Sequence, residues 1–189
     1  MKSLRIIAIL ATVILIPAMA YGQGSIGLSG TYVNPVKHLK TIADPGGGGS
    51  LDLFVPVVEE YFGIGGRVAY NVFNANEDTF TEGDTKVLEL VPSIRFNFVP
   101  TYYDMNLFIQ AGYGWYRWSV NTEIDNETID DFDHTDLGGY VGIGILGRIS
   151  DRVSLVIQPQ YHVINSSDRN ELDDNDLQYW SFNIGIQFE

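Results

Sequence analysis

The most constraining feature of the sequence is a two-residue alternation of apolar and polar side chains that recurs in eight separate runs. The runs cover residues 25–33, 49–57, 62–73, 87–98, 105–118, 137–149, 153–163 and 177–188. In the fifth run, one parity holds Leu107, Ile109, Ala111, Tyr113 and Trp115. Because successive side chains of a strand point to opposite faces, this pattern predicts eight β-strands rather than helices.

The second parity of the same runs is polar, charged or small. Its polar members are Asp52, Arg67, Asn71, Glu89, Ser93, Arg95, Asn97, Gln110, Gln158, Gln160, His162, Ser181, Asn183 and Gln187. A soluble barrel buries its apolar face, whereas a membrane barrel turns that face to lipid and keeps polar side chains inside. A soluble β-sandwich or a lipocalin-like carrier is the alternative that this pattern leaves open.

Two further observations favour the membrane barrel. The runs have the length that a tilted strand needs to cross the hydrocarbon region. Aromatic residues also gather near both ends of the runs, as in the two interfacial girdles of membrane barrels. The loop-side set is Tyr32, Tyr70, Trp115, Trp118, Tyr161 and Trp180, and the turn-side set is Phe62, Phe96, Phe98, Tyr102, Tyr103 and Phe188. We therefore predict an all-β fold, an eight-stranded antiparallel up-and-down transmembrane β-barrel.

The connections between the runs alternate in length. Long polar segments, 34–48, 74–86, 119–136 and 164–176, follow the odd-numbered runs, and short turns follow the second, fourth and sixth. In an up-and-down meander this arrangement places every long loop at one end of the barrel. Both termini are then expected at the end with the short turns.

The first segment of the chain has the features of an export signal. The basic residues Lys2 and Arg5 precede an apolar run over residues 6–16, which is too short to span a bilayer as a helix. We predict a signal peptide over residues 1–22 and an outer-membrane β-barrel domain over residues 23–189. The absence of cysteine excludes disulfides and thiol chemistry, and the net charge of −13 makes nucleic acid an unfavourable partner.

Two segments carry a family resemblance. Residues 108–115 read FIQAGYGW and residues 179–188 read YWSFNIGIQF. With the export signal, they make the chain from residue 23 onward resemble the OmpA/OmpX-like eight-stranded outer membrane proteins of Gram-negative bacteria. In that family a terminal aromatic residue is read by the insertion machinery, whereas here Phe188 is followed by Glu189.

The resemblance implies a location in the cell outer membrane and three kinds of partner. These are outer-membrane lipid, lipopolysaccharide, and the barrel-assembly machinery during insertion. It implies no nucleic-acid partner and no cofactor, and we expect a monomer.

Five charged residues share the inward parity. They are Asp52, Arg67, Glu89, Arg95 and Arg148. Because an isolated buried charge is prohibitively costly, we expect them to form an ion-pair network that plugs the lumen. The alternative is a charged constriction in a small pore, but eight strands leave little free space inside.

Three of the long connections, 74–86, 119–136 and 164–176, are strongly acidic and hold 16 of the 24 Asp and Glu residues. A solvated, soluble surface is the simplest interpretation. A weak divalent-cation loop is the alternative, because carboxylates are hard oxygen ligands. Its candidate ligands are Asp125, Glu127, Asp130, Asp131, Asp133 and Asp136. The ligand spacing of an EF-hand is missing from this segment.

The glycine-rich segment 44–49 is predicted to be a flexible turn.

Catalytic residues are not expected. His162 and Ser166 faintly resemble the arrangement of lipid A deacylases, but their spacing and the inward parity of His162 do not fit a nucleophile and its base. We expect the imidazole of His162 to form a hydrogen bond inside the barrel with Gln160 or Gln110. The sequence thus predicts a non-enzymatic barrel with a structural or surface-interaction role. The alternatives are a small pore or passive transporter, a lipid A-modifying enzyme and a soluble carrier.

Overall fold

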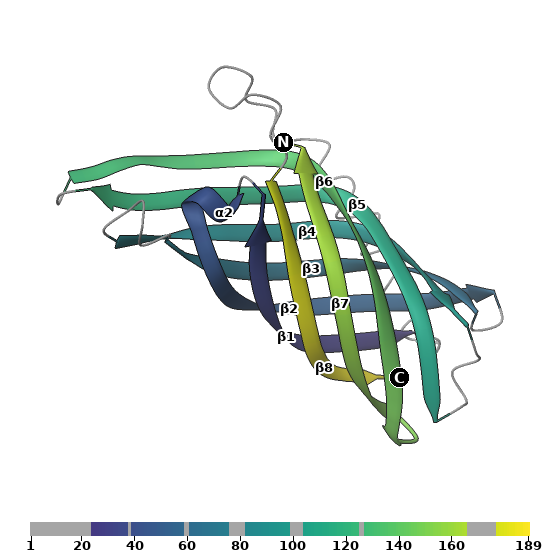
Figure 1. Ribbon diagram of the computed structural model, residues 1–189. Coiled ribbons are helices and arrows are strands. Elements are labelled where there is room, and N and C mark those ends of the chain that lie inside the picture. Colours follow the sequence, from purple (N-terminus) through teal and green to yellow (C-terminus); the bar gives the residue numbers. More distant parts are fainter. Residues whose placement is uncertain are drawn as a thin grey trace.

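The computed structural model describes residues 24–37, 39–58, 61–75, 82–98, 104–124, 127–165 and 177–189. They form a closed barrel in which each strand pairs antiparallel with the next, and β1 pairs with β8 (Figure 1). The strands are β1 Ser25–Val36, β2 Ala43–Val58, β3 Phe62–Ala75, β4 Glu82–Asn97, β5 Met105–Ile124, β6 Glu127–Ser150, β7 Val153–Asn165 and β8 Leu177–Phe188. A short helix, α2 (Leu39–Ile42), lies between β1 and β2. The predicted eight-stranded meander is confirmed.

The seam of the barrel joins the two ends of the chain. Ile26 is the register partner of Phe188, at the end of the barrel where Val58 leads almost directly into Phe62. The long connections therefore lie at the opposite end, which we call the loop end, and the short ones lie at the turn end. The segment predicted as a signal peptide falls outside the described residues.

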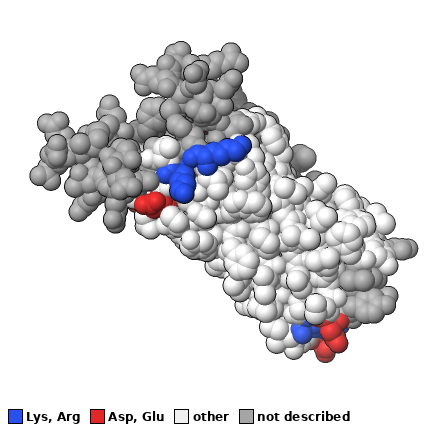
Figure 2. Space-filling model, in the orientation of Figure 1, with Lys and Arg blue, Asp and Glu red and all other residues white. Residues whose placement is uncertain are grey.

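Apolar and polar side chains are divided between the outer and inner faces of the sheet as the alternation predicts for a membrane barrel. Leu28, Ile94 and Ile184 on the outer face are each 51% exposed, whereas Arg67 and Gln110 on the inner face are 1% exposed. On the face seen in Figure 2, charged side chains of the described residues gather at the two ends and leave an uncharged band between them. The described part of the chain contains no helix that is long and apolar enough to cross a membrane.

Several strands extend further toward the loop end than the sequence predicts. The prediction of a loop over residues 119–136 was wrong for most of that segment, because β5 continues to Ile124 and β6 begins at Glu127 (Figure 1). The two strands stay paired through Ile124 and Glu127. The polar composition of the segment indicated a loop, although its backbone continues the pairing of β5 with β6.

The prediction of a flexible turn over residues 44–49 was also wrong. This segment belongs to β2 and pairs with β1 on one side and β3 on the other. A Cβ atom at Gly46 would clash with the carbonyl oxygen of Val72, and one at Gly48 would clash with that of Tyr70. Glycine is needed here because the neighbouring backbone comes close to the strand, and not because the chain turns.

Candidate functional site

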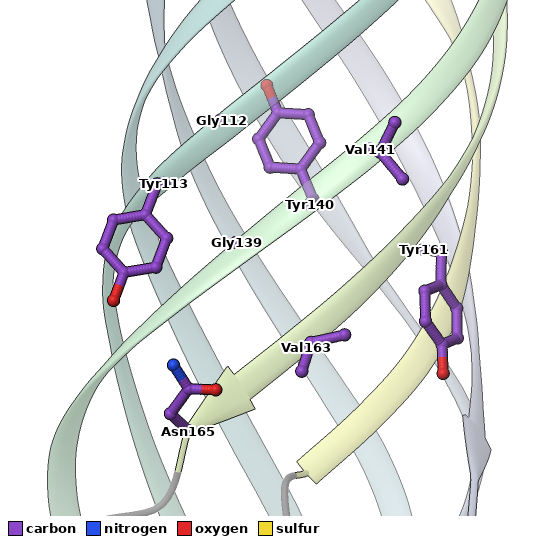
Figure 3. A pocket seen from close by; sticks show the side chains of 8 residues that line it. All are labelled: Gly112, Tyr113, Gly139, Tyr140, Val141, Tyr161, Val163 and Asn165. Carbon is purple, nitrogen blue, oxygen red and sulfur yellow. The ribbon is translucent and has the colours of Figure 1, made fainter.

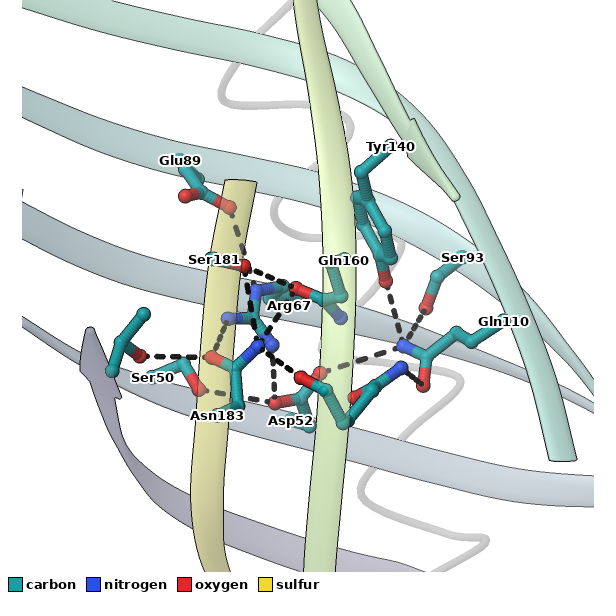
Figure 4. Close-up of polar contacts among 12 residues, drawn as sticks. Ser50, Asp52, Arg67, Glu89, Ser93, Gln110, Tyr140, Gln160, Ser181 and Asn183 are labelled. Atoms are coloured by element: carbon teal, nitrogen blue, oxygen red, sulfur yellow. Dashed lines mark hydrogen bonds and ion pairs between the residues drawn. The ribbon is translucent and has the colours of Figure 1, made fainter. Parts of the chain in front are cut away.

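The lumen is occupied near its middle by Arg67, which β3 directs inward. Its Nη1 atom lies 3.0 Å from Asp52 Oδ2 on β2, and its Nη2 atom donates to Asn183 Oδ1 on β8 at 2.8 Å (Figure 4). Its Nε atom lies 3.4 Å from Glu89 Oε2 on β4. One guanidinium therefore connects strands on opposite sides of the barrel, and its charge is balanced by two carboxylates.

A second inward side chain, Gln110 on β5, extends this contact set across the lumen. Its Nε2 atom donates to the hydroxyl of Tyr140 at 2.6 Å, and its Oε1 atom accepts from Arg95 Nη2 at 3.0 Å (Figure 4 shows Gln110 and Tyr140). We call Asp52, Arg67, Glu89, Gln110 and Asn183 the central network. Because all five are buried and bonded across several strands, the network fills the lumen with fixed polar groups.

Arg95 lies on the turn-end side of the central network. Its guanidinium carbon is 4.3 Å from the ring centroids of both Phe54 and Phe108, so the cation is held between two aromatic rings. Its Nη1 atom donates to Gln187 Oε1 at 2.8 Å. Gly144 makes room for this arrangement, since a Cβ at that position would clash with the ring of Phe108.

The structure thus brings together four of the five charged residues predicted to face inward. Asp52, Arg67 and Glu89 are in direct contact, and Arg95 reaches them through Gln110. Arg148 is half-buried at the turn end, where its backbone nitrogen donates to the carbonyl of Asp104 at 2.7 Å.

His162 lies on the loop-end side of Glu89 and is fully buried. Its Nε2 atom is 2.9 Å from Ser181 Oγ, its Nδ1 atom is 3.3 Å from the hydroxyl of Tyr116, and its ring stacks on Tyr179 at 4.3 Å. The inward direction of this histidine is confirmed. The partners predicted for it, Gln160 and Gln110, were wrong, because the side chains that reach the ring come from β5 and from the neighbouring strand β8.

Ser181, His162 and Glu89 lie in the order of a nucleophile, a base and a carboxylate. The His162 Nδ1 to Glu89 Oε2 distance is 3.8 Å, too long for a hydrogen bond, and Glu89 instead accepts from the hydroxyl of Tyr179 at 2.7 Å. Ser181 is 2% exposed, so a substrate has no approach to its hydroxyl in this arrangement. The contacts fit a structural hydrogen-bond network better than a hydrolytic site. Ser166, the other serine considered for catalysis, lies outside the described residues.

The loop-end part of the lumen is apolar, which the alternation did not predict. Its buried side chains are Val33, Leu39, Ala43, Phe73, Val87, Val91, Tyr116, Trp118, Tyr140, Ile164, Leu177 and Tyr179, here called the loop-end cluster. Leu39 belongs to α2, so this helix contributes a side chain to the packing inside the barrel. The cluster lies on the loop-end side of the central network.

Trp118 was predicted in the outer aromatic girdle, and that placement was wrong. Its ring is 4% exposed, and its Nε1 atom donates to Asp136 Oδ2 at 2.8 Å. Tyr32, Tyr70 and Trp180 of the same predicted girdle do lie on the outer face, each about half exposed. The parity of its own strand pointed to the lumen, since Trp115 and Trp118 differ by an odd number of positions.

The candidate cation ligands among the described residues are spread along β6. Asp125 lies outside the described residues, and Glu127, Asp130 and Asp131 belong to the β6 backbone. Asp133 forms an ion pair with Arg117, and Asp136 accepts the bond from Trp118. Within the described part of the chain, no group of three or more His, Asp or Glu side chains is placed to hold a metal ion.

Solved structures with the same architecture are outer membrane proteins. Neisserial surface protein A shares 12% identity at a TM-score of 0.62, over 88% of this chain and 96% of its own. OprG from Pseudomonas aeruginosa shares 12% identity at a TM-score of 0.54, over 87% and 94%. Ail, the attachment invasion locus protein of Yersinia pestis, shares 14% identity at 0.51, over 87% and 97%. At these identities the likeness shows the fold.

Comparison with curated protein sequences finds none that matches this chain. The profile of one protein family, described as the outer membrane protein beta-barrel domain, matches residues 6–188. Members of this family lie in the bacterial outer membrane, in agreement with the apolar outer face and the polar lumen. This chain belongs to the outer membrane protein beta-barrel domain family.

Proposed function

We propose that this protein is a non-enzymatic outer-membrane barrel with a sealed lumen, and that its role is carried by acidic strands and loops at the cell surface. Membrane barrels of this kind have short periplasmic turns and longer extracellular loops, so the loop end faces outward from the cell. The observation that carries the proposal is the contrast between a filled interior and one section of the wall, β4 to β6, that continues past the last pairing of β6 with β7.

The projecting part of the barrel wall is formed by β5 and β6, and β4 stays paired with β5 as far as Glu82 and Glu123. Pairing of β6 with β7 ends at Leu137 and Asn165, whereas pairing of β6 with β5 continues to Glu127. Ten further residues of β6 therefore extend past the last contact with β7, a strand length of about 33 Å. A barrel that served only as a plug in the membrane needs no such extension.

The charge of this projection favours a basic partner. Seven acidic residues lie between Glu123 and Asp136, and the only basic side chain in that segment is His134. Complementary charge steers association and raises its rate, with a strong dependence on salt. The proposed partner is thus a basic surface or peptide outside the cell.

Binding to a basic peptide tests this role. The purified barrel in lipid nanodiscs should bind immobilised poly-lysine, and the binding should weaken as the salt concentration rises. The triple variant Asp130→Asn, Asp131→Asn and Asp133→Asn should bind more weakly. The control replaces Asp104→Asn, Asp151→Asn and Glu189→Gln at the turn end, which removes the same charge from the periplasmic side. Equal loss in both triple variants, or equal binding to poly-glutamate, would contradict the proposal.

A small pore is the second candidate function, and the charged interior is the observation that favours it. The contacts of Arg67, Gln110 and Tyr140 across the lumen argue against a pore, because these side chains block its path. The loop-end cluster fills the lumen on their loop-end side. Eight-stranded barrels have an interior that side chains just fill. We therefore infer that the interior serves to stabilise the barrel and not to conduct.

A further inference from the structure

One edge of β6 is open at the loop end. The last register pair between β6 and β7 joins Leu137 to Asn165. Among the described residues, none pairs with β6 on this side from Glu127 to Asp136. Figure 3 shows Asn165 where β7 ends, while β6 runs on past it. On its other side β6 stays paired with β5 as far as Glu127, so the open side is the edge of the projecting wall (Figure 1).

The backbone groups at this edge follow from the alternation along the strand. The N–H of Arg148 donates to the carbonyl of Asp104, which leads into β5, at 2.7 Å. The register between β5 and β6 then continues without a shift to Phe132. Because successive residues of a strand direct their N–H and C=O groups to opposite neighbours, the even-numbered residues bond to β5. Asp133 and Thr135 therefore present their N–H and C=O groups at the open edge.

A β-bulge bounds the regular part of the edge. Val120 of β5 pairs with Phe132, but Thr122 pairs with Ile129, so one residue of β5 faces residues 130–131 of β6. Bulges and charged residues commonly protect edge strands from indiscriminate pairing. The regular edge between the bulge and the start of β7 pairing is therefore short, and it admits only a short extended segment.

The charge along the edge determines which strand can pair there. Five of the ten residues from Glu127 to Asp136 are acidic, and His134 is the only residue among them with a basic side chain. The carboxylate of Asp133 is already paired with Arg117, so this position offers mainly its backbone. Like charges opposite each other destabilise a strand pair, whereas opposite charges stabilise it. A second copy of this chain would bring the same acidic edge, whereas a strand rich in lysine or arginine meets complementary charge.

We propose that the open edge of β6 binds a basic segment in extended conformation, which adds a strand to the projecting sheet. The backbone groups of Asp133 and Thr135 form hydrogen bonds with the segment, and the acidic residues of β6 attract its lysine and arginine side chains. The inference rests on the surface role proposed above and deepens it by naming the form of the partner. It differs from a contact through charge alone because it requires backbone N–H groups in the partner.

Two peptides of equal charge separate strand pairing from charge alone. One is a short peptide of alternating lysine and threonine, and the other is the same peptide with every backbone nitrogen methylated. The barrel in lipid nanodiscs should bind the plain peptide about tenfold more tightly, because the methylated peptide cannot donate to the carbonyl groups of the edge. Equal affinity would overturn the strand pairing and leave the surface role standing. Failure of both peptides to bind would overturn both proposals.

The Thr135→Pro variant tests the edge itself. Proline removes one N–H group from the open side and leaves the bonds between β6 and β5 in place, because Thr135 faces away from β5. The affinity for the plain peptide should fall about tenfold, to the level of the methylated peptide. Heat-dependent mobility on a gel confirms that the variant is folded. An unchanged affinity would show that the peptide binds elsewhere on the protein.

Hydrogen exchange of the wild-type backbone gives a test that needs no substitution. In the free barrel the amides of Asp133 and Thr135 should exchange rapidly, whereas those of His134 and Asp136, which bond to β5, should exchange slowly. The plain peptide should slow the exchange at Thr135 about tenfold, as expected for a new hydrogen bond. Slow exchange at Thr135 without any peptide would overturn the proposal, because the edge would then already be covered.

Discussion

Arg67 Nη1 lies 3.0 Å from Asp52 Oδ2, and the two residues are register partners on β3 and β2. The pairing satisfies a guanidinium that is 1% exposed, so the barrel depends on keeping both members. Loss of one partner leaves the other charge buried without compensation, which is more damaging than replacing the pair by apolar groups.

The Arg67→Gln substitution is the most direct test of the central network. It should lower the free energy of unfolding by about 3–5 kcal/mol, because Asp52 and Glu89 then remain as adjacent buried carboxylates. Urea unfolding in lipid vesicles, followed by tryptophan fluorescence, measures the change. The matched control is Arg117→Gln, which removes an exposed guanidinium and should have a much smaller effect; equal effects would show that Arg67 is not a structural centre.

Arg95 should not tolerate lysine. Its planar guanidinium stacks between Phe54 and Phe108 and donates to Gln187 and Gln110, a geometry that an ammonium group cannot reproduce. The Arg95→Lys variant should be less stable by about 2 kcal/mol in the same unfolding experiment. Unchanged stability would mean that this position requires only a positive charge, and not a planar guanidinium between the two rings.

Conductance separates the sealed barrel from the pore. Because the central network and the loop-end cluster fill the lumen, the wild-type protein should give no discrete steps in planar bilayers under applied voltage. A porin reconstituted in the same bilayers is the positive control. Reproducible single-channel steps that disappear when Arg67 is replaced would instead support the charged-constriction alternative.

The buried serine and histidine allow the enzyme alternative to be tested as well. Cells that overproduce the wild-type barrel should have the same lipid A mass spectrum as cells that overproduce the Ser181→Ala variant, because Ser181 is enclosed beside His162. Both proteins must reach the outer membrane in equal amounts, as judged by heat-dependent gel mobility. A lipid A species that loses or gains an acyl chain only in cells that overproduce the wild type would contradict the non-enzymatic assignment.

The sequence predicted the barrel and its orientation because the two-residue period assigns each side chain to a face. It placed Arg67, Glu89 and Arg95 in the lumen for that reason. It could not predict which carboxylate meets which arginine, since that depends on the register between strands and on side chains from β5 and β8. The partners of His162 were missed for the same reason.

The misplacement of Trp118 occurred where residue type and parity disagreed. Trp118 was assigned to the girdle by its type and its position near a strand end, although its parity pointed inward. Phe73 and Val87 belong to the loop-end cluster, and each adjoins an outward apolar residue, Val72 or Leu88. Consecutive apolar residues at the loop end of a run were therefore the available signal that the lumen is apolar there.

The ion pair between Arg117 and Asp133 gives a prediction for pH dependence at the loop end. Hydrogen bonding from Arg117 holds the pKa of the Asp133 carboxyl below its usual value. A carboxyl whose pKa is lower in the folded protein contributes stability above its unfolded pKa, and this contribution is lost as the pH falls through the folded value. Carbon-13 NMR of the labelled carboxyl in detergent micelles should record a titration below the ordinary range for aspartate. In the Arg117→Gln variant the midpoint should rise toward that range; an unchanged midpoint would show that the guanidinium does not hold Asp133 in solution.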